Sequence, residues 1–170
     1  PNVQEAKDAT KELLAEFTKN GRLPDSHAAP SIAEAVQSQL ATVKPGDYIA
    51  FLNYIEETPA VDRKLQQIRT YLRDTTRCAT TIGYGPRFLH STGQLHKGGP
   101  NSGVFFQLGA KDEVDFPVPG EAYSFGILKE AQALGDFRAL KARGRRVVRI
   151  DLGEALLSGL EELEAAIKSS

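Results

Sequence analysis

Four short runs of apolar residues lie along the chain, separated by longer stretches in which apolar residues recur at helical spacing. The runs cover residues 48–54, 78–82, 103–108 and 147–152 and are rich in aliphatic, aromatic and β-branched side chains. A short apolar run of this kind, bounded by turn residues, is typical of a strand that is buried on both faces. We therefore predict four strands at these positions.

The stretches between and beside the strands carry helix signals. Ser31 followed by Glu34 forms a capping-box pattern, and Asn20-Gly21 supplies a stop because glycine accepts the left-handed conformation at a helix end. Strands that alternate with helices favour a mainly parallel sheet with helices on both faces. The sequence thus predicts a three-layer α/β/α sandwich of Rossmann-like type, with helices over residues 4–19, 31–43, 58–73, 89–95, 124–142 and 154–168.

The composition indicates one globular domain that spans residues 1–170. Of the 170 residues, 41% are hydrophobic and 25% are charged, and no segment approaches the roughly 18 consecutive apolar residues of a membrane-spanning helix. Residues 1–20 mix acidic and basic side chains throughout, unlike a signal peptide. We therefore expect a cytoplasmic protein with no membrane partner.

The net charge and the single cysteine bear on two further functions, nucleic-acid binding and cysteine chemistry. A net charge of −1 does not supply the broad basic surface that binding to a nucleic-acid backbone requires, so we expect no nucleic-acid partner. Cys78 has no second cysteine to pair with and is expected to be a buried, unreactive residue. His27 stands apart from the other candidate residues, and we assign it a structural role.

One segment carries most of the polar groups expected at the binding edge of the sheet. Ligands of open parallel sheets bind beyond the carboxyl ends of the strands. Residues 83–100 read GYGPRFLHSTGQLHKGGP, so that a strand ends in glycines and is followed by an arginine, a histidine, two hydroxyls and a glutamine. Glycines let the backbone approach a ligand, and hydroxyls at a helix start can hold an anionic or polyhydroxylated molecule. Arg87 can contact a phosphate through two hydrogen bonds.

For each of these residues a structural role is the alternative. Ser91 or Thr92 can simply cap the helix that follows, and Arg87 can be a solvated surface cation. A single histidine such as His90 is more often structural than catalytic. The segment alone therefore indicates a site without deciding its chemistry.

Three familiar motifs fail in this segment. Gly83-x-Gly85 lacks the third glycine of the dinucleotide fingerprint, and Lys97 follows no phosphate-loop pattern. His90 and His96 have no acidic or cysteine residue near them at metal-ligand spacing. We therefore expect no cofactor and no metal ion.

The run Phe88-Leu89-His90-Ser91-Thr92-Gly93-Gln94 resembles the LHS-x-GQ segment of phosphoglucose isomerases. The longer string GPRFLHSTGQLHKGGPNSGVF, with YSFGILK at 123–129 and AQALGD at 131–136, is similar to the isomerase half of bacterial fused transaldolase and phosphoglucose isomerases. The resemblance covers residues 48–153. It implies a sugar-isomerase domain that interconverts glucose 6-phosphate and fructose 6-phosphate, in glycolysis, gluconeogenesis and the pentose phosphate pathway. It also implies preceding isomerase and transaldolase domains in the same polypeptide.

The resemblance assigns roles to particular residues. The family's histidine at the LHS position assists opening of the sugar ring, and His90 matches it. A carboxylate then moves a proton between C2 and C1 through an enediol, while cations and polar donors stabilise the oxyanion. In that family a second subunit completes the active site, so a homodimer is among the implied arrangements.

The sequence departs from the family in three places. No loop rich in serine and threonine precedes Tyr48, so the phosphate-binding half is not evident. The Glu-Ser-x-Gly-Lys setting of the base glutamate is absent, although Glu56 and Glu57 lie at a suitable distance before His90. The family's late lysine has no clear match. Lys129 is our substitute candidate, with a surface lysine as its structural alternative, and Lys97 is a second candidate.

These considerations fix the candidate residues. The candidate catalytic residues are His90 and Lys129, and the candidate substrate-binding residues are Arg87, Ser91, Thr92, Gln94 and Lys97. The leading interpretation is an isomerase component that is inactive when isolated. The alternative is a noncatalytic sugar-phosphate-binding regulatory domain.

Overall fold

The structure, a computed structural model, describes residues 2–24 and 30–170. Residue 1 and residues 25–29, among them His27, lie outside the described residues. The described elements, in chain order, are α1 (Asn2–Asn20), α2 (Ile32–Leu40), β1 (Tyr48–Tyr54), α3 (Pro59–Thr76), β2 (Ala79–Tyr84), the 3₁₀ turn η1 (Arg87–Leu89), α4 (Ser91–Gly98), β3 (Gly103–Gly109), α5 (Phe125–Ala142), β4 (Arg146–Asp151) and α6 (Leu156–Lys168).

The described residues form one sheet of four strands in the order β2-β1-β3-β4, and every pair of neighbours is parallel. Tyr48 at the start of β1 lies opposite Ala79 of β2 and Gly103 of β3. β3 continues the sheet by pairing Val104 with Arg146 of β4. Because parallel neighbours cannot be joined by a tight hairpin, each connection crosses a face of the sheet and carries a helix.

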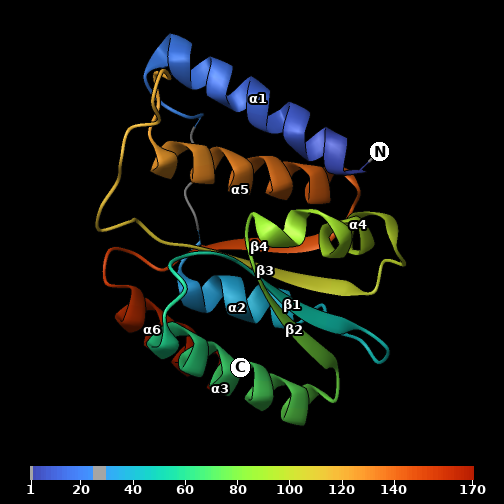
Figure 1. Cartoon of the computed structure of the whole chain (residues 1–170). Coiled ribbons are helices and arrows are strands. Elements are labelled where there is room, and N and C mark those ends of the chain that lie inside the picture. The colour runs from blue at the N-terminus through green and yellow to red at the C-terminus, as the bar shows by residue number, and fades with distance from the viewer. Residues whose placement is uncertain (1, 25–29) are drawn as a thin grey trace.

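Helices cover both faces of this sheet (Figure 1). α2, α3 and α6 lie below the sheet in that view, whereas α4 and α5 lie above it. α1 packs on the outer side of α5, so α5 lies between α1 and the sheet. The predicted three-layer α/β/α sandwich is confirmed, with α1 as an additional helix on the upper layer.

Two apolar cores result, one on each face. Successive side chains of a strand point to opposite faces, so Ile49 and Phe51 of β1 join the lower core while Ala50 and Leu52 join the upper core. The lower core is the larger, and it is built with apolar side chains of α2, α3 and α6. The upper core is smaller, and the buried polar residues His96, Lys97 and Asp136 of α4 and α5 share that layer.

Several predicted element boundaries are confirmed. β1 coincides with the predicted strand, and the Ser124 hydroxyl accepts a hydrogen bond from the Ile127 N–H at the start of α5. The capping box of Ser31 and Glu34 is formed at α2. The helix predicted over residues 89–95 is instead divided into η1 and α4. His90 separates the two because its φ of −78° and ψ of −103° are not helical.

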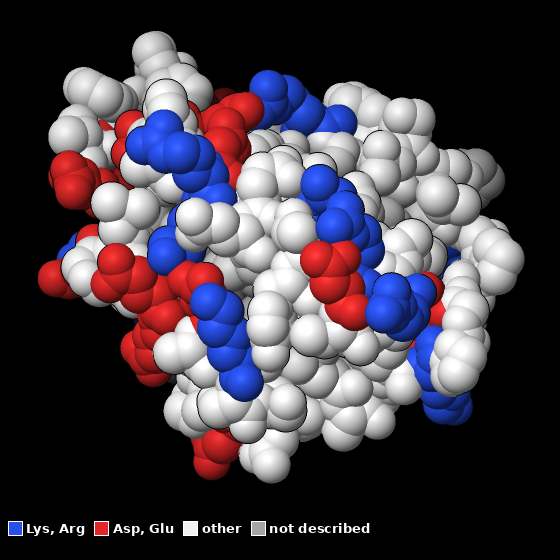
Figure 2. Space-filling view, turned by 90° about the horizontal axis from the view of Figure 1, so that it is seen from below, with Lys and Arg blue, Asp and Glu red and all other residues white. Residues whose placement is uncertain are grey.

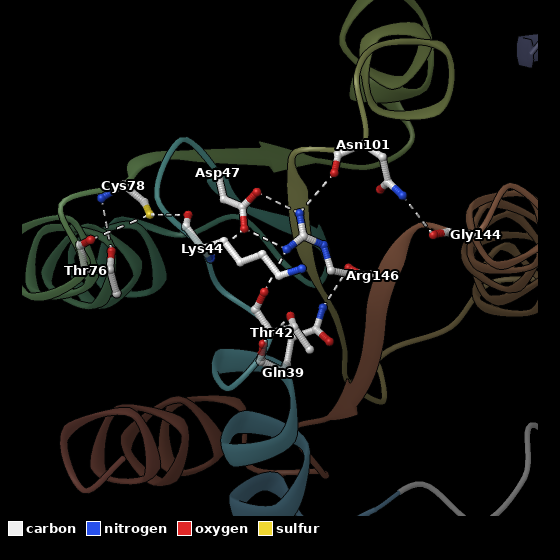
Figure 3. Close-up of polar contacts among 9 residues, drawn as sticks. All are labelled: Gln39, Thr42, Lys44, Asp47, Thr76, Cys78, Asn101, Gly144 and Arg146. Atoms are coloured by element: carbon white, nitrogen blue, oxygen red, sulfur yellow. Dashed lines mark hydrogen bonds and ion pairs between the residues drawn. The ribbon is translucent and has the colours of Figure 1, made fainter.

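A polar network closes the amino edge of the sheet (Figure 3). The Arg146 guanidinium donates to both carboxylate oxygens of Asp47, at 2.6 and 2.8 Å, and also to the carbonyl oxygens of Thr42 and Asn101. Gln39 donates to the Arg146 carbonyl oxygen from α2. The network therefore joins the chain before β1, the chain before β3 and the first residue of β4. The Arg146 guanidinium also lowers the pKa of the Asp47 carboxyl.

The outer surface of the lower layer carries acidic and basic side chains that are interspersed (Figure 2). One ion pair in this layer joins two helices, with Lys64 Nζ of α3 lying 2.7 Å from Glu164 Oε2 of α6. Within residues 2–24 and 30–170, each helix is too short or too polar to cross a bilayer.

The contact between α6 and the end of β4 gives a test of the packing. Gly159 is buried in α6, and a Cβ atom there would overlap the Leu152 carbonyl oxygen and lie 2.8 Å from the Leu152 Cβ. We predict that Gly159→Ala lowers the free energy of unfolding by about 1–3 kcal/mol, the usual cost of overpacking. At an uncrowded helix position the same change would raise it by about 0.5–1 kcal/mol.

Urea unfolding of both variants and the wild type measures this effect. Ser158→Ala, at the exposed neighbouring position of α6, is the control and should change stability by no more than about 0.5 kcal/mol. A Gly159→Ala variant as stable as the control would show that α6 does not pack this closely on β4.

Candidate functional site

The carboxyl ends of the four strands lie at one edge of the sheet, at Tyr54, Tyr84, Gly109 and Asp151. The neighbouring strands β1 and β3 lead to helices on opposite faces, α3 below and α5 above. Open α/β sheets bind ligands outside such a topological switch point. We therefore take this edge, with the segment that follows β2, as the candidate site.

The segment after β2 passes closely over its neighbours because of two glycines. A Cβ atom on Gly85 would lie 2.5 Å from the Tyr54 ring, and one on Gly83 would lie 3.2 Å from the Phe88 Cβ. The absence of side chains at these positions lets the chain turn back onto the upper face, where η1 and α4 pack. The sequence suggested that a ligand could approach the backbone at these glycines. The space beside them is instead occupied by the side chains of Tyr54 and Phe88.

α4 presents three of the predicted site residues on its outer face, and the N-cap residue His90 directly before the helix is the fourth. His90, Ser91, Thr92 and Gln94 are all exposed. His90 occupies the N-cap position, and its side chain makes no capping hydrogen bond. Ser91 and Thr92 are therefore the first helical residues, and neither has the simple capping role that was the structural alternative for them.

Lys97, the fifth predicted residue on α4, points in the opposite direction. Only 1% of its side chain is exposed, and its ammonium group forms an ion pair with Asp136 of α5, which is equally buried. Burial raises the pKa of the Asp136 carboxyl, and the Lys97 ammonium opposes that increase. Lys97 was assigned to substrate binding, but here it faces the interior and cannot contact a ligand at the surface.

Arg87 lies in a shallow surface hollow beside β2. The hollow has a volume of about 500 Å³ and is lined by Glu57, Asp62, Gln66, Ile82, Gly83, Tyr84, Arg87 and Phe88. The Arg87 guanidinium forms an ion pair with Glu57 and lies 5.9 Å from the centre of the Tyr84 ring. The Tyr84 hydroxyl donates to Asp62 at 2.5 Å. Arg87 and one of the two candidate base glutamates are therefore adjacent, whereas Glu56 is exposed nearby.

Lys129 lies on the first turns of α5, in a different part of the edge. Its ammonium forms an ion pair with Asp112, which follows β3, and both side chains are partly exposed. The same loop supplies Asp115, whose carboxylate accepts hydrogen bonds from the Ser124 hydroxyl and the Gly126 N–H. Arg87 and Lys129, the two candidate cations that are not buried, are thus each paired with a carboxylate of the same chain.

Sequence reasoning did not identify the polar groups beneath α4. His96 is 3% exposed, stacks on Tyr48, and its Nδ1 lies 2.9 Å from the Tyr48 hydroxyl. Burial, with a smaller effect of the Lys97 charge, lowers the pKa of His96 to about 4. Asp136 could have been noticed in the sequence as an aspartate within residues 131–140, which are otherwise mainly apolar. In the described part of the chain, no three His, Cys, Asp or Glu side chains are grouped so as to hold a metal ion.

Comparison with known proteins supports the fold. No family model matches the sequence, and no curated protein matches it either. A crystal structure of a hypothetical protein from Thermus thermophilus is similar, with a TM-score of 0.60 and 18% sequence identity. The similarity covers 79% of this chain and 38% of that chain, so this chain spans well under half of that protein. At this identity the similarity shows the fold alone.

The burial of His96 makes stability depend on pH. The folded state keeps His96 neutral down to a pKa of about 4, whereas an unfolded histidine titrates near its ordinary value of 6.5. Between these values the unfolded state binds more protons, so the free energy of unfolding falls as the pH falls from about 6.5 to about 4. We predict that His96 contributes at most about 3 kcal/mol to this loss.

The measurement compares wild type with His96→Gln by chemical denaturation at several pH values between 7 and about 4. The glutamine does not titrate, and its side-chain amide offers the Tyr48 hydroxyl both a donor and an acceptor. The variant should lose less stability on acidification than wild type. Parallel pH profiles for the two proteins would contradict the burial of a neutral His96.

Proposed function

We propose that this chain is a sugar-isomerase domain that contributes to the interconversion of glucose 6-phosphate and fructose 6-phosphate. In this proposal the domain acts in the cytoplasm, joined to a preceding isomerase domain and a transaldolase domain. The observation that carries the proposal is the outer face of α4, where His90, Ser91, Thr92 and Gln94 are exposed together. These are the residues on which the resemblance to phosphoglucose isomerases depends.

His90 is the proposed acid and base for opening the sugar ring. It donates a proton to the ring oxygen as the ring C–O bond breaks, and it accepts the proton of the C1 hydroxyl group as the carbonyl forms. An exposed histidine suits this step, since the substrate must reach the imidazole directly. Ser91, Thr92 and Gln94 offer neighbouring donors and acceptors for sugar hydroxyls.

The cations have supporting roles in the proposal. Lys129 would stabilise the oxyanion of the enediol, and Arg87 would contact the phosphate. Their pairing with Asp112 and Glu57 means that each cation must exchange a carboxylate partner for an anionic substrate. Lys97 has no place in substrate contact, because its ammonium is buried against Asp136.

The same pairing favours one alternative, a regulatory domain that binds a sugar phosphate without converting it. Both candidate cations are already paired, and neither Glu56 nor Glu57 lies in the motif expected for the base. The longer polypeptide is the proposed protein in which an isomerase domain and a transaldolase domain precede this chain. A regulatory domain would bind the sugar phosphate without turnover, both alone and in the longer polypeptide, so isomerase activity of the longer polypeptide separates the two proposals.

We predict that this chain alone has little or no isomerase activity, whereas the longer polypeptide has it. The reason is that the chain lacks an evident phosphate loop and a base in the expected motif. The measurement is formation of glucose 6-phosphate from fructose 6-phosphate, coupled to a dehydrogenase that uses glucose 6-phosphate. Turnover by the chain alone at the rate of a complete isomerase would contradict this prediction. An inactive longer polypeptide would contradict the proposed function.

We also predict the effect of His90→Ala on turnover by the longer polypeptide. General acid and base assistance is typically worth about 100- to 10,000-fold, so turnover at saturating substrate should fall by that order while the unfolding midpoint is unchanged. Gln67→Ala, at an exposed position on α3, is the matched control and should retain full turnover. A His90→Ala protein with nearly full turnover would leave His90 with a structural role only.

A further inference from the structure

The residues of α4, together with the N-cap residue His90 that precedes it, divide into an outer face and an inner face. The outer face carries His90, Ser91, Thr92 and Gln94, and the inner, buried face carries Gly93, His96 and Lys97. At 3.6 residues per turn, a shift of one residue turns a helix by about 100°. The direction in which the outer face points is therefore fixed by whatever holds the inner face.

Several contacts hold that inner face. The Lys97 ammonium pairs with Asp136 of α5, and the His96 ring stacks on Tyr48 of β1 and meets the Phe105 ring of β3 edge to face, with ring centres 4.8 Å apart. At the end of the helix, the Arg145 guanidinium donates to the carbonyl oxygens of Lys97 and Gly99, at 2.7 Å each. Among these contacts, only the Lys97–Asp136 pair joins α4 to the helix that carries Lys129.

The space beneath the helix is shaped for this lysine. A Cβ atom on Gly93 would lie 2.8 Å from the Phe88 carbonyl oxygen and 3.6 Å from Lys97 Nζ. Gly93 precedes Lys97 by one helical turn, so its missing side chain leaves α4 close to η1 with the ammonium group beside it. The glycine of the HSTGQ run and the lysine that follows thus form one packing arrangement.

A fully buried ion pair is a poor source of stability. Removing two charges from water costs several kcal/mol per ion, and replacing such a pair by apolar side chains is often neutral or stabilising. Its effect is directional: the ammonium group finds a carboxylate in only one rotation of α4, whereas apolar side chains tolerate several. The pair is therefore better suited to selecting one orientation than to stabilising the fold.

We propose that Lys97 and Asp136 are positioning residues, whose ion pair sets the rotation of α4 on α5 and so the direction of the His90 face. The catalytic consequence rests on the proposed function, whereas the orientation of α4 is a property of this chain alone. Neither residue contacts the substrate in this proposal.

The first experiment uses this chain and exploits its lack of methionine, because Lys97→Met introduces the only methionine methyl group. The test protein is Lys97→Met/Asp136→Leu, and the matched control is Lys168→Met, at an exposed position of α6. Both should unfold near the wild-type midpoint. The His90 imidazole signals, measured by NMR, should shift or split in the test protein and stay unchanged in the control.

The methyl signal gives a second readout of the same property. In the test protein it should appear as several or broadened signals, because α4 then occupies more than one rotation. A single sharp methyl signal together with wild-type His90 signals would overturn the proposal. If the leucine prevents folding, Lys97→Met/Asp136→Val carries the same expectations and the same contrary outcome.

The second experiment measures the longer polypeptide. Misplacing a catalytic group by about 1 Å can cost on the order of 100-fold in rate, so kcat should fall by about 10- to 100-fold. KM should change less than kcat, because Arg87, the proposed phosphate contact, lies in η1 and does not turn with α4. An unchanged kcat would overturn the positioning role in catalysis. If the wild-type polypeptide itself lacks isomerase activity, the proposed function fails, and the NMR measurements still decide the orientation of α4.

Discussion

The parallel pairing of β1 with both β2 and β3 is the constraint on which the rest of the structure depends. It buries nearly all of β1 and places the carboxyl ends of β1, β2 and β3 at one edge, to which the parallel pairing of β3 with β4 adds the end of β4. Neither face of such a sheet can remain in water, so every connection must contribute a helix. The position of α4 above β1, and with it the position of His90, follows from the crossing between β2 and β3.

The two edges of the sheet use their charges differently. At the amino edge, both terminal nitrogens of the Arg146 guanidinium donate hydrogen bonds to Asp47, and one also donates to the Thr42 carbonyl oxygen. These donors are therefore engaged in joining the strands. At the carboxyl edge, the pairs of Arg87 with Glu57 and Lys129 with Asp112 are partly or largely exposed. Exposed pairs contribute little to stability and exchange partners readily. The carboxyl edge therefore keeps charges that a ligand can recruit.

The sequence was sufficient for the fold class and for most of the helices and strands, and only partly sufficient for the site. Strands such as 48–54 and the capped start of α5 were predictable because their signals are local, within a few residues. The direction of Lys97 was not, because it depends on Asp136, a distant residue that meets Lys97 only after α5 packs over the sheet. The strand order was also beyond local signals. From the sequence alone, a lysine in a glycine-rich polar segment is readily assigned to ligand binding, and only the position of Asp136 shows that Lys97 is buried.

The run HSTGQLHK thus consists of the N-cap residue His90 and most of α4, and its exposed and buried positions carry residues of different character. Its exposed positions carry groups that can exchange protons and hydrogen bonds with a ligand, while Gly93, His96 and Lys97 fit the interior. A fully polar inner face would be costly to bury, and here that cost is limited because each polar group meets a specific partner, Tyr48 or Asp136. Such partners accept one geometry only. Because α4 is held in one orientation, its N-cap residue His90 points in a defined direction.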